Sequence, residues 1–469
     1  MSKRPHVLFV TADQHRGDTL SCEGHPCVRT PHLDLLAYEG VRFSRAYTDC
    51  PICIPARTTM ITGIQSHVYG MPTFAPQYRI QRDHAKFLGS IMTAAGYQTH
   101  IVGKTHWHTE PSDRGGFECV EDYDRLERLR LIRTGREGRL TGMGRNELEA
   151  SLSYFPPELH TTDWTMDRAM DFIEYRDQTD PFFLWLSLED PHMELQIHEP
   201  YYSMYDNAAI PEPNIPDWCR RDEDLPVSFV EHRQGNNCLP KHADQLRKAR
   251  GVYYGMVTNI DHQLARIVGK LKRRGLWEDT IFVYTCDHGE FLGDFGDACK
   301  SFHFEPTARV PMIFRLPRWM PAATNRACRG LVELADLLPT LCELTGCPCP
   351  DDITGRSLVP LLTGSAEAVR DELHTQMNHD HMLHDGRYKY MYFGDDGREL
   401  LFDMESDPRE TVNLAGDDKL AAMMRAKLVA HLTAEGNADC VDGKLSNLGR
   451  KLTPRTERSP IDWLGWAGT

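Results

Sequence analysis

Apolar runs alternate with helical patterns along most of the chain, and this alternation constrains the fold more than any other feature. Buried strands are predicted at 7–12, 99–102, 182–188, 280–285 and 311–314. Helices are predicted at Pro31–Gly40, from Thr58 onward, and at Ala85–Gly96, Asp163–Arg176, Leu246–Arg274 and Leu331–Leu344. We therefore expect an α/β fold with a large mixed, mostly parallel sheet sandwiched by helices.

The pattern changes after about Gly364. Two strands at 388–393 and 399–402 are joined by the turn Gly394-Asp-Asp-Gly397, and a helix is predicted at 420–432. We expect an α/β domain at 1–370 and a small C-terminal α+β domain with an antiparallel sheet, followed by a tail, at 371–469.

Two segments between the predicted elements, 110–157 and 195–240, are irregular and rich in Pro, Arg and Asp. We interpret them as long loops over one end of the sheet, where substrate specificity commonly resides.

Composition excludes several classes of protein. The 469 residues carry a net charge of -15, which argues against a general nucleic-acid or anionic-membrane binder. No apolar run approaches the roughly 20 residues of a membrane-spanning helix. The first residues lack the apolar stretch of a signal peptide, so we expect a cytoplasmic protein. The 14 cysteines in so long a chain do not suggest a disulfide scaffold.

Acidic side chains follow two of the predicted strands. Asp13-Gln14 comes after the first strand, and Asp287-His288 follows the strand at 280–285. Ligands of a doubly wound sheet bind at the carboxyl ends of its strands. Two carboxylates, an amide oxygen and an imidazole suit a divalent cation. Each Asp taken alone is better interpreted as the cap of a helix or turn.

A third segment, Cys50 to Gly63, has several interpretations. The pair Cys50 and Cys53 has the C-x-x-C spacing of a redox motif or of half a zinc site. A thioredoxin-like unit and a second ligand pair are both hard to find in the sequence. Two buried, inert cysteines are the third interpretation.

Cys53-Ile-Pro55-Ala-Arg57, continuing to Thr62-Gly63, resembles the signature of the type I (formylglycine-dependent) sulfatases of the alkaline-phosphatase-like superfamily. Further segments resemble the family in the same order along nearly the whole chain. They are Gly103-Lys104-Thr-His106, Pro191-His192, Lys300 with Glu305 and Arg309-Val-Pro311, Glu333 to Thr340, and Glu399 to Asp403 with Asp407-Pro408.

This resemblance implies a site and its cofactors. The domain at 1–370 would be the catalytic domain, with an alkaline-phosphatase-like fold. The implied metal ligands are Asp13, Gln14, Cys53, Asp287 and His288, and the implied catalytic residues are Cys53, Arg57, Lys104, His106, His192 and Lys300. One divalent ion is implied, Ca²⁺ first and Mn²⁺ or Mg²⁺ as alternatives. A formylglycine-generating or sulfatase-maturing enzyme would oxidise Cys53 to Cα-formylglycine.

The implied chemistry is covalent catalysis in which the modified side chain itself releases the sulfate. The aldehyde at position 53 hydrates to a geminal diol, and one hydroxyl attacks sulfur and expels the alcohol. The second hydroxyl gives its proton to His106, so the aldehyde reforms and sulfate leaves. Arg57 and Lys104 would hold the modified side chain and the sulfate oxygens, and His192 or Lys300 would act as general acid.

Two positions depart from the pattern of many sulfatases. Those enzymes have a second Asp where this chain has Gln14 and an Asn where it has His288. The combination here is similar to phosphonate monoester and phosphodiester hydrolases of the same family, which lack the Lys and His that this chain keeps at 104 and 106. We therefore predict a sulfatase acting on a carbohydrate or aryl sulfate, with phosphonate or phosphodiester hydrolysis as the alternative. An unmatured protein that only binds a metal or an anion is a third hypothesis.

Three other features stay outside this site. His379, His381 and His384 lie close together, and we interpret them as polar residues of an edge strand rather than a second metal site. The arginines of 125–139 are interpreted as a solvated face that could also recognise a second anionic group. The tail at 459–466 carries two Trp and is a candidate contact for a homo-oligomer.

Overall fold

A central sheet organises the structure, a computed structural model in which residues 4–74, 78–80, 82–107, 114–135, 146–235, 238–240 and 242–452 are described. Within these residues the sheet has eight strands in the order β11-β2-β10-β9-β1-β7-β4-β5. Their bounds are β1 His6–Ala12, β2 Val41–Phe43, β4 Gln98–Gly103, β5 Cys119–Glu121, β7 Phe182–Ser187, β9 Thr280–Cys286, β10 Met312–Arg315 and β11 Arg326–Cys328. All pairs are parallel except those of β10 with β9 and β2. The expected mixed, mostly parallel sheet is confirmed.

Strand β1 lies at the middle of this sheet, which explains its continuous apolar sequence. It pairs in parallel with β7 on one edge and with β9 on the other. Val7, Leu8, Phe9 and Val10 are completely buried because helices cover both faces of the sheet.

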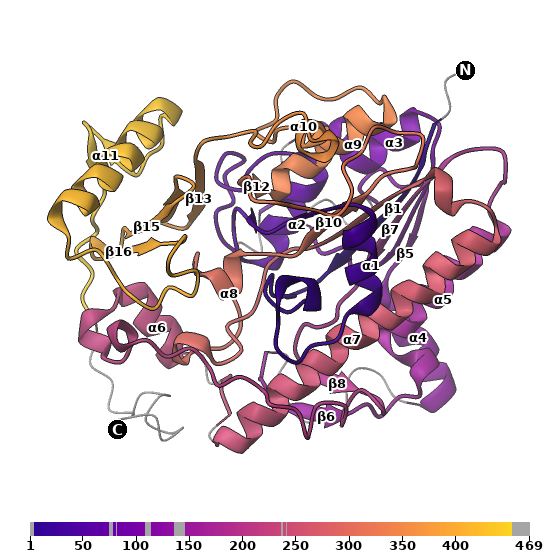
Figure 1. The fold of residues 1–469 in the computed structure, drawn as a ribbon, viewed down its shortest axis with the longest axis horizontal. Coiled ribbons are helices and arrows are strands. Elements are labelled where there is room, and N and C mark those ends of the chain that lie inside the picture. Colours follow the sequence, from indigo (N-terminus) through magenta and orange to yellow (C-terminus); the bar gives the residue numbers. More distant parts are fainter. Residues whose placement is uncertain are drawn as a thin grey trace.

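The helices form two layers, one on each face of the sheet (Figure 1). Helices α1 and α5 both contact the long α7 on one face, with α4 packed on α5. Helices α2, α3 and α9 cover the other face, where α2 contacts both α3 and α9. Their bounds are α1 Pro31–Glu39, α2 Cys53–Thr62, α3 Leu88–Ala94, α4 Tyr123–Thr134, α5 Thr161–Tyr175, α7 Ala243–Arg273 and α9 Leu337–Thr345.

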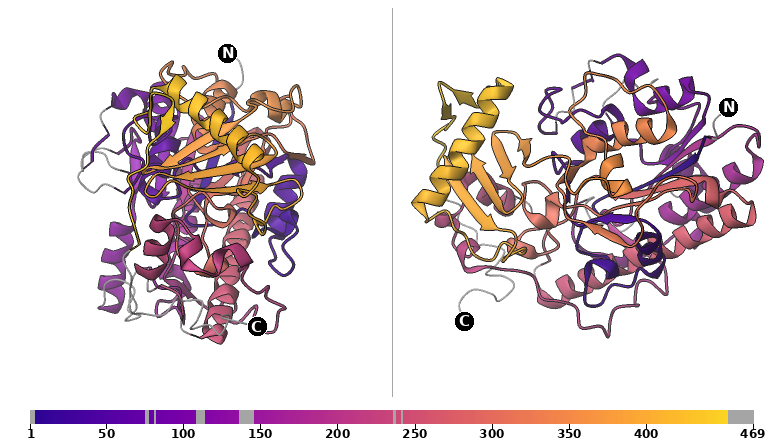
Figure 2. Two further views of the ribbon diagram at one scale, coloured as in Figure 1. Left: turned by 90° about the vertical axis from the view of Figure 1, so that its left-hand side faces the viewer. Right: turned by 45° about the horizontal axis from the view of Figure 1, so that its top comes forward.

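A second sheet forms a smaller lobe at one end of the molecule (Figure 2). Its antiparallel strands are β13 Leu373–Met377, β14 Asp380–His384, β15 Tyr388–Phe393 and β16 Arg398–Asp403. Helix α11, Asp418–Glu435, packs Met424 and Leu428 on one face of this sheet. The other face packs on a cluster of aromatic side chains from the main body. The expected small C-terminal antiparallel sheet is confirmed, while the domain boundary near residue 370 stays a prediction.

Short elements complete the described chain. Three two-stranded pairs are β3 Ala46–Tyr47 with β12 Val332–Glu333, β6 Ala150–Leu152 with β8 Leu195–Ile197, and β17 Cys440–Val441 with β18 Lys444–Leu445. Short helices are α6 Val227–Gly235, α8 Glu305–Ala308 and α10 Val359–Thr363. Among the described residues, no helix is long and apolar enough to cross a membrane.

Several predicted elements differ in the structure. Helix α2 begins at Cys53 rather than near Thr58, because Pro55 lies in its first turn, where a missing N–H costs nothing. The helix predicted at 85–96 is a 3-10 turn followed by the shorter α3. The helix predicted at 331–344 starts with strand β12 and a 3-10 turn before α9, since Glu333 and Asp336 form a capping box there.

The predicted loops and histidines also differ. The segments 110–157 and 195–240 contain α4, α6 and the β6–β8 pair, so they are more regular than expected. Strand β14, which carries His381 and His384, lies inside the small sheet between β13 and β15. The interpretation of these histidines as edge-strand residues is therefore wrong. The Trp-containing tail lies outside the described residues.

Candidate active site

The ends of two neighbouring strands bring the predicted metal ligands together. Strands β1 and β9 pair so that Ala12 lies beside Cys286, and the next residues, Asp13 and Asp287, are both completely buried. The backbone N–H of Gln14 donates to Asp287 Oδ1 at 3.1 Å and so links the two strand ends. The edge predicted from the sequence is the edge at which the site forms.

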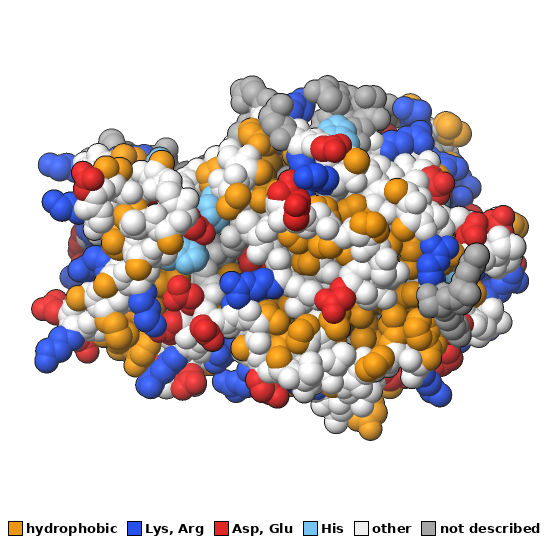
Figure 3. All heavy atoms as spheres, turned by 90° about the horizontal axis from the view of Figure 1, so that it is seen from above, with side chains coloured by type: hydrophobic (Ala, Val, Ile, Leu, Met, Phe, Trp, Pro, Cys, Tyr) orange, Lys and Arg blue, Asp and Glu red, His pale blue; other side chains and the backbone are white. Residues whose placement is uncertain are grey.

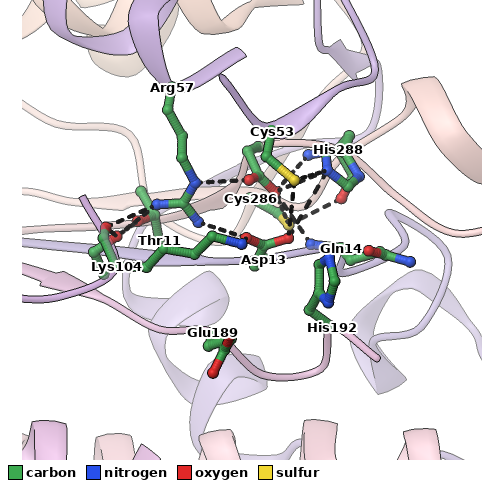
Figure 4. A network of polar contacts seen from close by, with 12 residues as sticks. Thr11, Asp13, Gln14, Cys53, Arg57, Lys104, Glu189, His192, Cys286 and His288 are labelled. Carbon is green, nitrogen blue, oxygen red and sulfur yellow. Dashed lines mark hydrogen bonds and ion pairs between the residues drawn. The ribbon is translucent and has the colours of Figure 1, made fainter. Parts of the chain in front are cut away.

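Cys53, the first residue of α2, projects into this cluster. Its Sγ lies 3.1 Å from His288 Nε2 and 3.8 Å from Asp13 Oδ1. Figure 4 shows Arg57 and Lys104 reaching Asp13 from one side, with Cys53 and His288 on the other. The thiols of Cys50 and Cys53 are both free, and Cys50 Sγ faces the Pro72 carbonyl at 3.6 Å.

Arg57 binds one oxygen of each of the two buried carboxylates. Its buried guanidinium donates to Asp287 Oδ2 at 2.8 Å and to Asp13 Oδ2 at 3.1 Å. The other oxygens, both Oδ1, lie 3.8 Å from His288 Nε2. Arg57 also donates to Ser187 Oγ at the end of β7, at 2.7 Å. The guanidinium therefore neutralises and orients the carboxylates, so that their Oδ1 atoms face the imidazole.

The donor atoms fit a divalent cation. One ligand atom from each of Asp13, Cys53, Asp287 and His288 lies within 4.8 Å of the others. His288 Nδ1 lies 2.9 Å from the Gly289 carbonyl, which can only accept a hydrogen bond, so Nδ1 carries the proton and Nε2 keeps its lone pair. Carboxylate and amide oxygens with one imidazole suit Ca²⁺, Mg²⁺ or Mn²⁺.

Glu290 supports this set and was missed by the sequence reasoning, although it follows Asp287-His288-Gly289 directly. Its Oε2 accepts a hydrogen bond from Gln14 Nε2, which turns Gln14 Oε1 toward Lys300 Nζ at 3.2 Å. Its Oε1 accepts from the backbone N–H groups of Leu292 at 3.0 Å and Cys299 at 2.6 Å. Burial raises the pKa of Glu290 to about 7.

Two lysines and two histidines surround residue 53. Lys300 Nζ lies 3.1 Å from Cys53 Sγ and donates to His192 Nε2 at 2.8 Å. His192 Nδ1 contacts the Met193 carbonyl, so its Nε2 is the acceptor of the Lys300 proton. Lys104 Nζ pairs with Asp13 Oδ2 at 2.5 Å, and the exposed His106 follows β4. All the residues predicted for the site are brought together.

The charges shift the ionisation of residue 53. Burial alone would raise the pKa of the Cys53 thiol, but Lys300, Lys104 and His288, together with a hydrogen bond from His106, hold it well below its usual range. Burial and the Lys300 ammonium lower the pKa of His192, which keeps the imidazole neutral. The site therefore favours an anion at position 53 and offers several positive charges to an anionic substrate.

The chain is similar to several known proteins along most of its length. The family model described as Sulfatase matches residues 5–347, and the one described as N-sulphoglucosamine sulphohydrolase, C-terminal, matches residues 293–437. An arylsulfatase of Clostridium perfringens is 28% identical over 451 residues, which cover 89% of this chain and 91% of the relative. The multifunctional alkaline phosphatase superfamily protein PehA of Trinickia caryophylli is 29% identical over 490 residues, which cover 90% and 93%. The phosphonate monoester hydrolase structure of Agrobacterium radiobacter has a TM-score of 0.78 at 26% identity, over 92% of this chain and 96% of that one.

Proposed function

The chain belongs to the sulfatase family of sulfuric ester hydrolases, and from this membership we propose that it hydrolyses the sulfate monoester of an aryl alcohol or a carbohydrate. The nucleophile would be residue 53 after a maturing enzyme has oxidised the cysteine to Cα-formylglycine. In the structure, Cys53 Sγ stands for the hydroxyl oxygens of the hydrated aldehyde.

One observation carries this proposal: several cationic or proton-donating groups from separate segments meet at residue 53, opposite a buried set of metal donors. Lys300 Nζ lies 3.1 Å from Sγ, and Lys104 Nζ pairs with the neighbouring Asp13. A binding protein for a metal alone would have no use for the lysines, since they oppose a cation. A phosphate-like or sulfate-like group carries negative charge that these side chains stabilise.

The divalent ion and the hydrated formylglycine would each have a specific chemical role. A divalent ion held by Asp13, Gln14, Asp287 and His288 would polarise a substrate oxygen and favour the ionised nucleophile. The hydrated formylglycine would supply one hydroxyl for attack on sulfur and a second for release of sulfate. These four side chains are oriented for the ion by Arg57, by Glu290 and by the Gly289 carbonyl.

The remaining side chains hold charge and protons. Lys104 Nζ, 2.5 Å from Asp13 Oδ2, lies where it can also contact a sulfate oxygen. Lys300 Nζ holds the proton that the leaving alcohol needs, because His192 Nε2 is its hydrogen-bond acceptor and carries none. His192 keeps the Lys300 ammonium directed at the site. His106 would take the proton from the second hydroxyl of the hydrated aldehyde.

The test begins with the tryptic peptide Ala46 to Arg57, after co-expression with a formylglycine-generating enzyme. We expect its mass to fall by the cysteine-to-aldehyde difference, and the matured protein to hydrolyse p-nitrophenyl sulfate. Cys50→Ala is a matched control, because its thiol faces Pro72 and not the site. An unmodified Cys53, in cells that mature a control sulfatase, would contradict the mechanism and favour a protein that only binds a metal or an anion.

Phosphonate monoester or phosphodiester hydrolysis is the second candidate, because Gln14 and His288 make the metal site less anionic by one charge than the Asp and Asn of many sulfatases, and this pair is similar to the one in phosphonate monoester hydrolases. The phosphonate monoester hydrolase of Agrobacterium radiobacter is a structural relative. Phenyl phosphonate esters should be assayed beside aryl and sugar sulfates. A higher kcat/KM for the sulfates supports the first candidate, and a higher value for the phosphonates supports the second.

A further inference from the structure

Two histidines and a glutamate from separate segments converge where the small lobe meets the main body. His67 follows α2, His374 lies on β13, and Glu435 is the last residue of α11. His67 Nε2 and His374 Nδ1 lie 3.5 Å and 3.7 Å from the same oxygen, Glu435 Oε2. One ligand atom from each residue lies within 4.8 Å of the others. Bonds of about 2.0–2.1 Å to a tetrahedral ion place its ligand atoms roughly 3.3 Å apart.

Three of the four ring nitrogens of His67 and His374 have no hydrogen-bond partner among the described residues. The side chain of His374 is 1% exposed and that of His67 is 6% exposed. Within the described part of the chain, both nitrogens of His67 and Nδ1 of His374 are buried without a hydrogen-bond partner. Buried polar atoms are nearly always satisfied, so these three nitrogens call for a ligand.

Neighbouring side chains orient the cluster in the way that supporting residues orient metal ligands. His374 Nε2 lies 3.2 Å from His381 Nδ1, and His381 Nε2 lies 3.3 Å from Asp439 Oδ2. The Asp439 carboxylate favours a proton on His381 Nε2, so His381 Nδ1 accepts the Nε2 proton of His374. His374 Nδ1 is then left with a bare lone pair that faces Glu435.

The ionisation of the cluster agrees with metal binding. Burial and the nearby His381 and His67 hold the pKa of His374 well below its usual range, which keeps its imidazole neutral. Burial alone would raise the pKa of Glu435, but the hydrogen bond from His431, with His67 and His374 close by, holds it below its usual range. His431 Nε2 lies 3.0 Å from Glu435 Oε1 and leaves Oε2 for the cluster.

We propose that His67, His374 and Glu435 form a second metal site that binds a divalent transition ion, with Zn²⁺ the best match. Two imidazoles and one carboxylate with an open fourth position are a ligand set that zinc accepts. The partly exposed Glu435 side chain gives the ion a path from solvent. Figure 3 shows histidine side chains on the surface where the small lobe meets the main body. An ion there would tie the loop after α2 to β13 and α11, and so hold the two parts together.

A similar trio elsewhere shows why this cluster is distinctive. His160 and His198 both lie near Asp163 Oδ2, at 3.4 Å and 3.3 Å. The Asp163 carboxylate already accepts hydrogen bonds from Gln263 Nε2 at 2.7 Å and Asn259 Nδ2 at 3.4 Å. That carboxylate is saturated by neutral donors, whereas Glu435 Oε2 faces two nitrogens that have no hydrogen-bond partner in the described part of the chain.

The experiment compares zinc content across variants of the full chain. Each protein is stripped with a chelator, equilibrated with buffered Zn²⁺, passed through a desalting column and analysed by elemental mass spectrometry. We expect His67→Ala and Glu435→Gln each to bind one zinc fewer per chain than the wild type. His379→Ala is the matched control, since its half-exposed ring contacts Asp439 outside the ligand set. The site at Cys53 is intact in all four proteins, so its contribution cancels in the differences.

A second measurement, the melting temperature, shows whether each variant is folded. Zn²⁺ should raise the melting temperature of the wild type and of His379→Ala, and this rise should be lost in His67→Ala and Glu435→Gln, because only a ligand bound to the folded state stabilises it. Equal zinc content in the wild type and both ligand variants, when all four proteins melt cooperatively, would overturn the proposal.

Discussion

The site at residue 53 and the cluster around His67 are both rich in metal ligands, but they are built differently. The first gathers at the ends of two adjacent parallel strands, where Arg57 already neutralises one oxygen of each carboxylate. The second joins a loop, a strand and a helix end from the two lobes, and three of its ring nitrogens lack a hydrogen bond to any residue that the structure describes. Without a cation, the polar groups of the first site therefore keep their partners, whereas these three ring nitrogens of the second site have none among the described residues.

The catalytic and the structural site should therefore respond differently to mutation. The charges of the first site are paired with one another, so a substitution there should lower activity or leave a buried charge unpaired. Side chains of the second site depend on a ligand from outside, so a change there should matter only when that ligand is present. The following predictions test this contrast.

Cys53→Ala should have the largest effect. Removing a covalent nucleophile should lower kcat by on the order of 10⁵-fold, because the surrounding charges retain only the residual catalysis of binding. Steady-state assays with p-nitrophenyl sulfate on co-expressed protein measure this, with Cys50→Ala as control. A turnover near that of the control would mean that residue 53 is not the nucleophile.

Lys300→Met should lower kcat by about 10²–10⁴-fold, because it removes the proton donor beside the leaving group. The peptide mass should still report the aldehyde at position 53, which separates catalysis from maturation. Lys86→Met, a partly exposed lysine paired with Asp352, is the control. If Lys300→Met matched that control in kcat, another group would have to supply the proton.

Arg57→Met should lower the free energy of unfolding by about 3–5 kcal/mol in metal-free protein, because Asp13 and Asp287 lose their buried partner. Urea denaturation midpoints measure the loss. Arg42→Met is the control, since its pair with Glu23 is partly exposed and exposed pairs contribute about 0–1 kcal/mol. Equal losses in the two variants would show that the carboxylates do not depend on Arg57.

Glu290→Gln should weaken binding of the divalent ion at the first site by about 10–100-fold, because Gln14 loses the carboxylate that orients its amide. Calorimetric titration with Ca²⁺ and Mn²⁺ measures the affinity, with the exposed Glu278→Gln as control. An unchanged dissociation constant would remove Glu290 from the support of this site.

His67→Ala should have the smallest effect on zinc-free protein, about 1 kcal/mol of unfolding free energy, because the variant loses the packing of the ring on His374 but no hydrogen bond to the described residues. The denaturation midpoints with and without Zn²⁺ sharpen the contrast with Arg57→Met. A large loss in zinc-free protein would show that the cluster is held by its own contacts.

The alternation of strands and helices was readable because each central strand is apolar along its whole length. Val7 to Val10 and Phe182 to Leu186 are buried on both faces, so their sequences carry the signal locally. The start of α2 was misplaced, since Pro55 suggests a break unless its position in the first turn is known. The histidines of β14 were placed at a sheet edge because strand order depends on pairings far along the chain.

The sequence by itself determined the sheet, the two acidic strand ends and the motif at Cys53, because each depends on residues close together along the chain. The tertiary structure alone decided that Arg57 spans Asp13 and Asp287, that Lys300 donates to His192 and that Glu290 orients Gln14. It also decided that His67, His374 and Glu435 meet. These contacts follow from strand register and from how the small lobe packs on the body, which no local pattern of residues encodes.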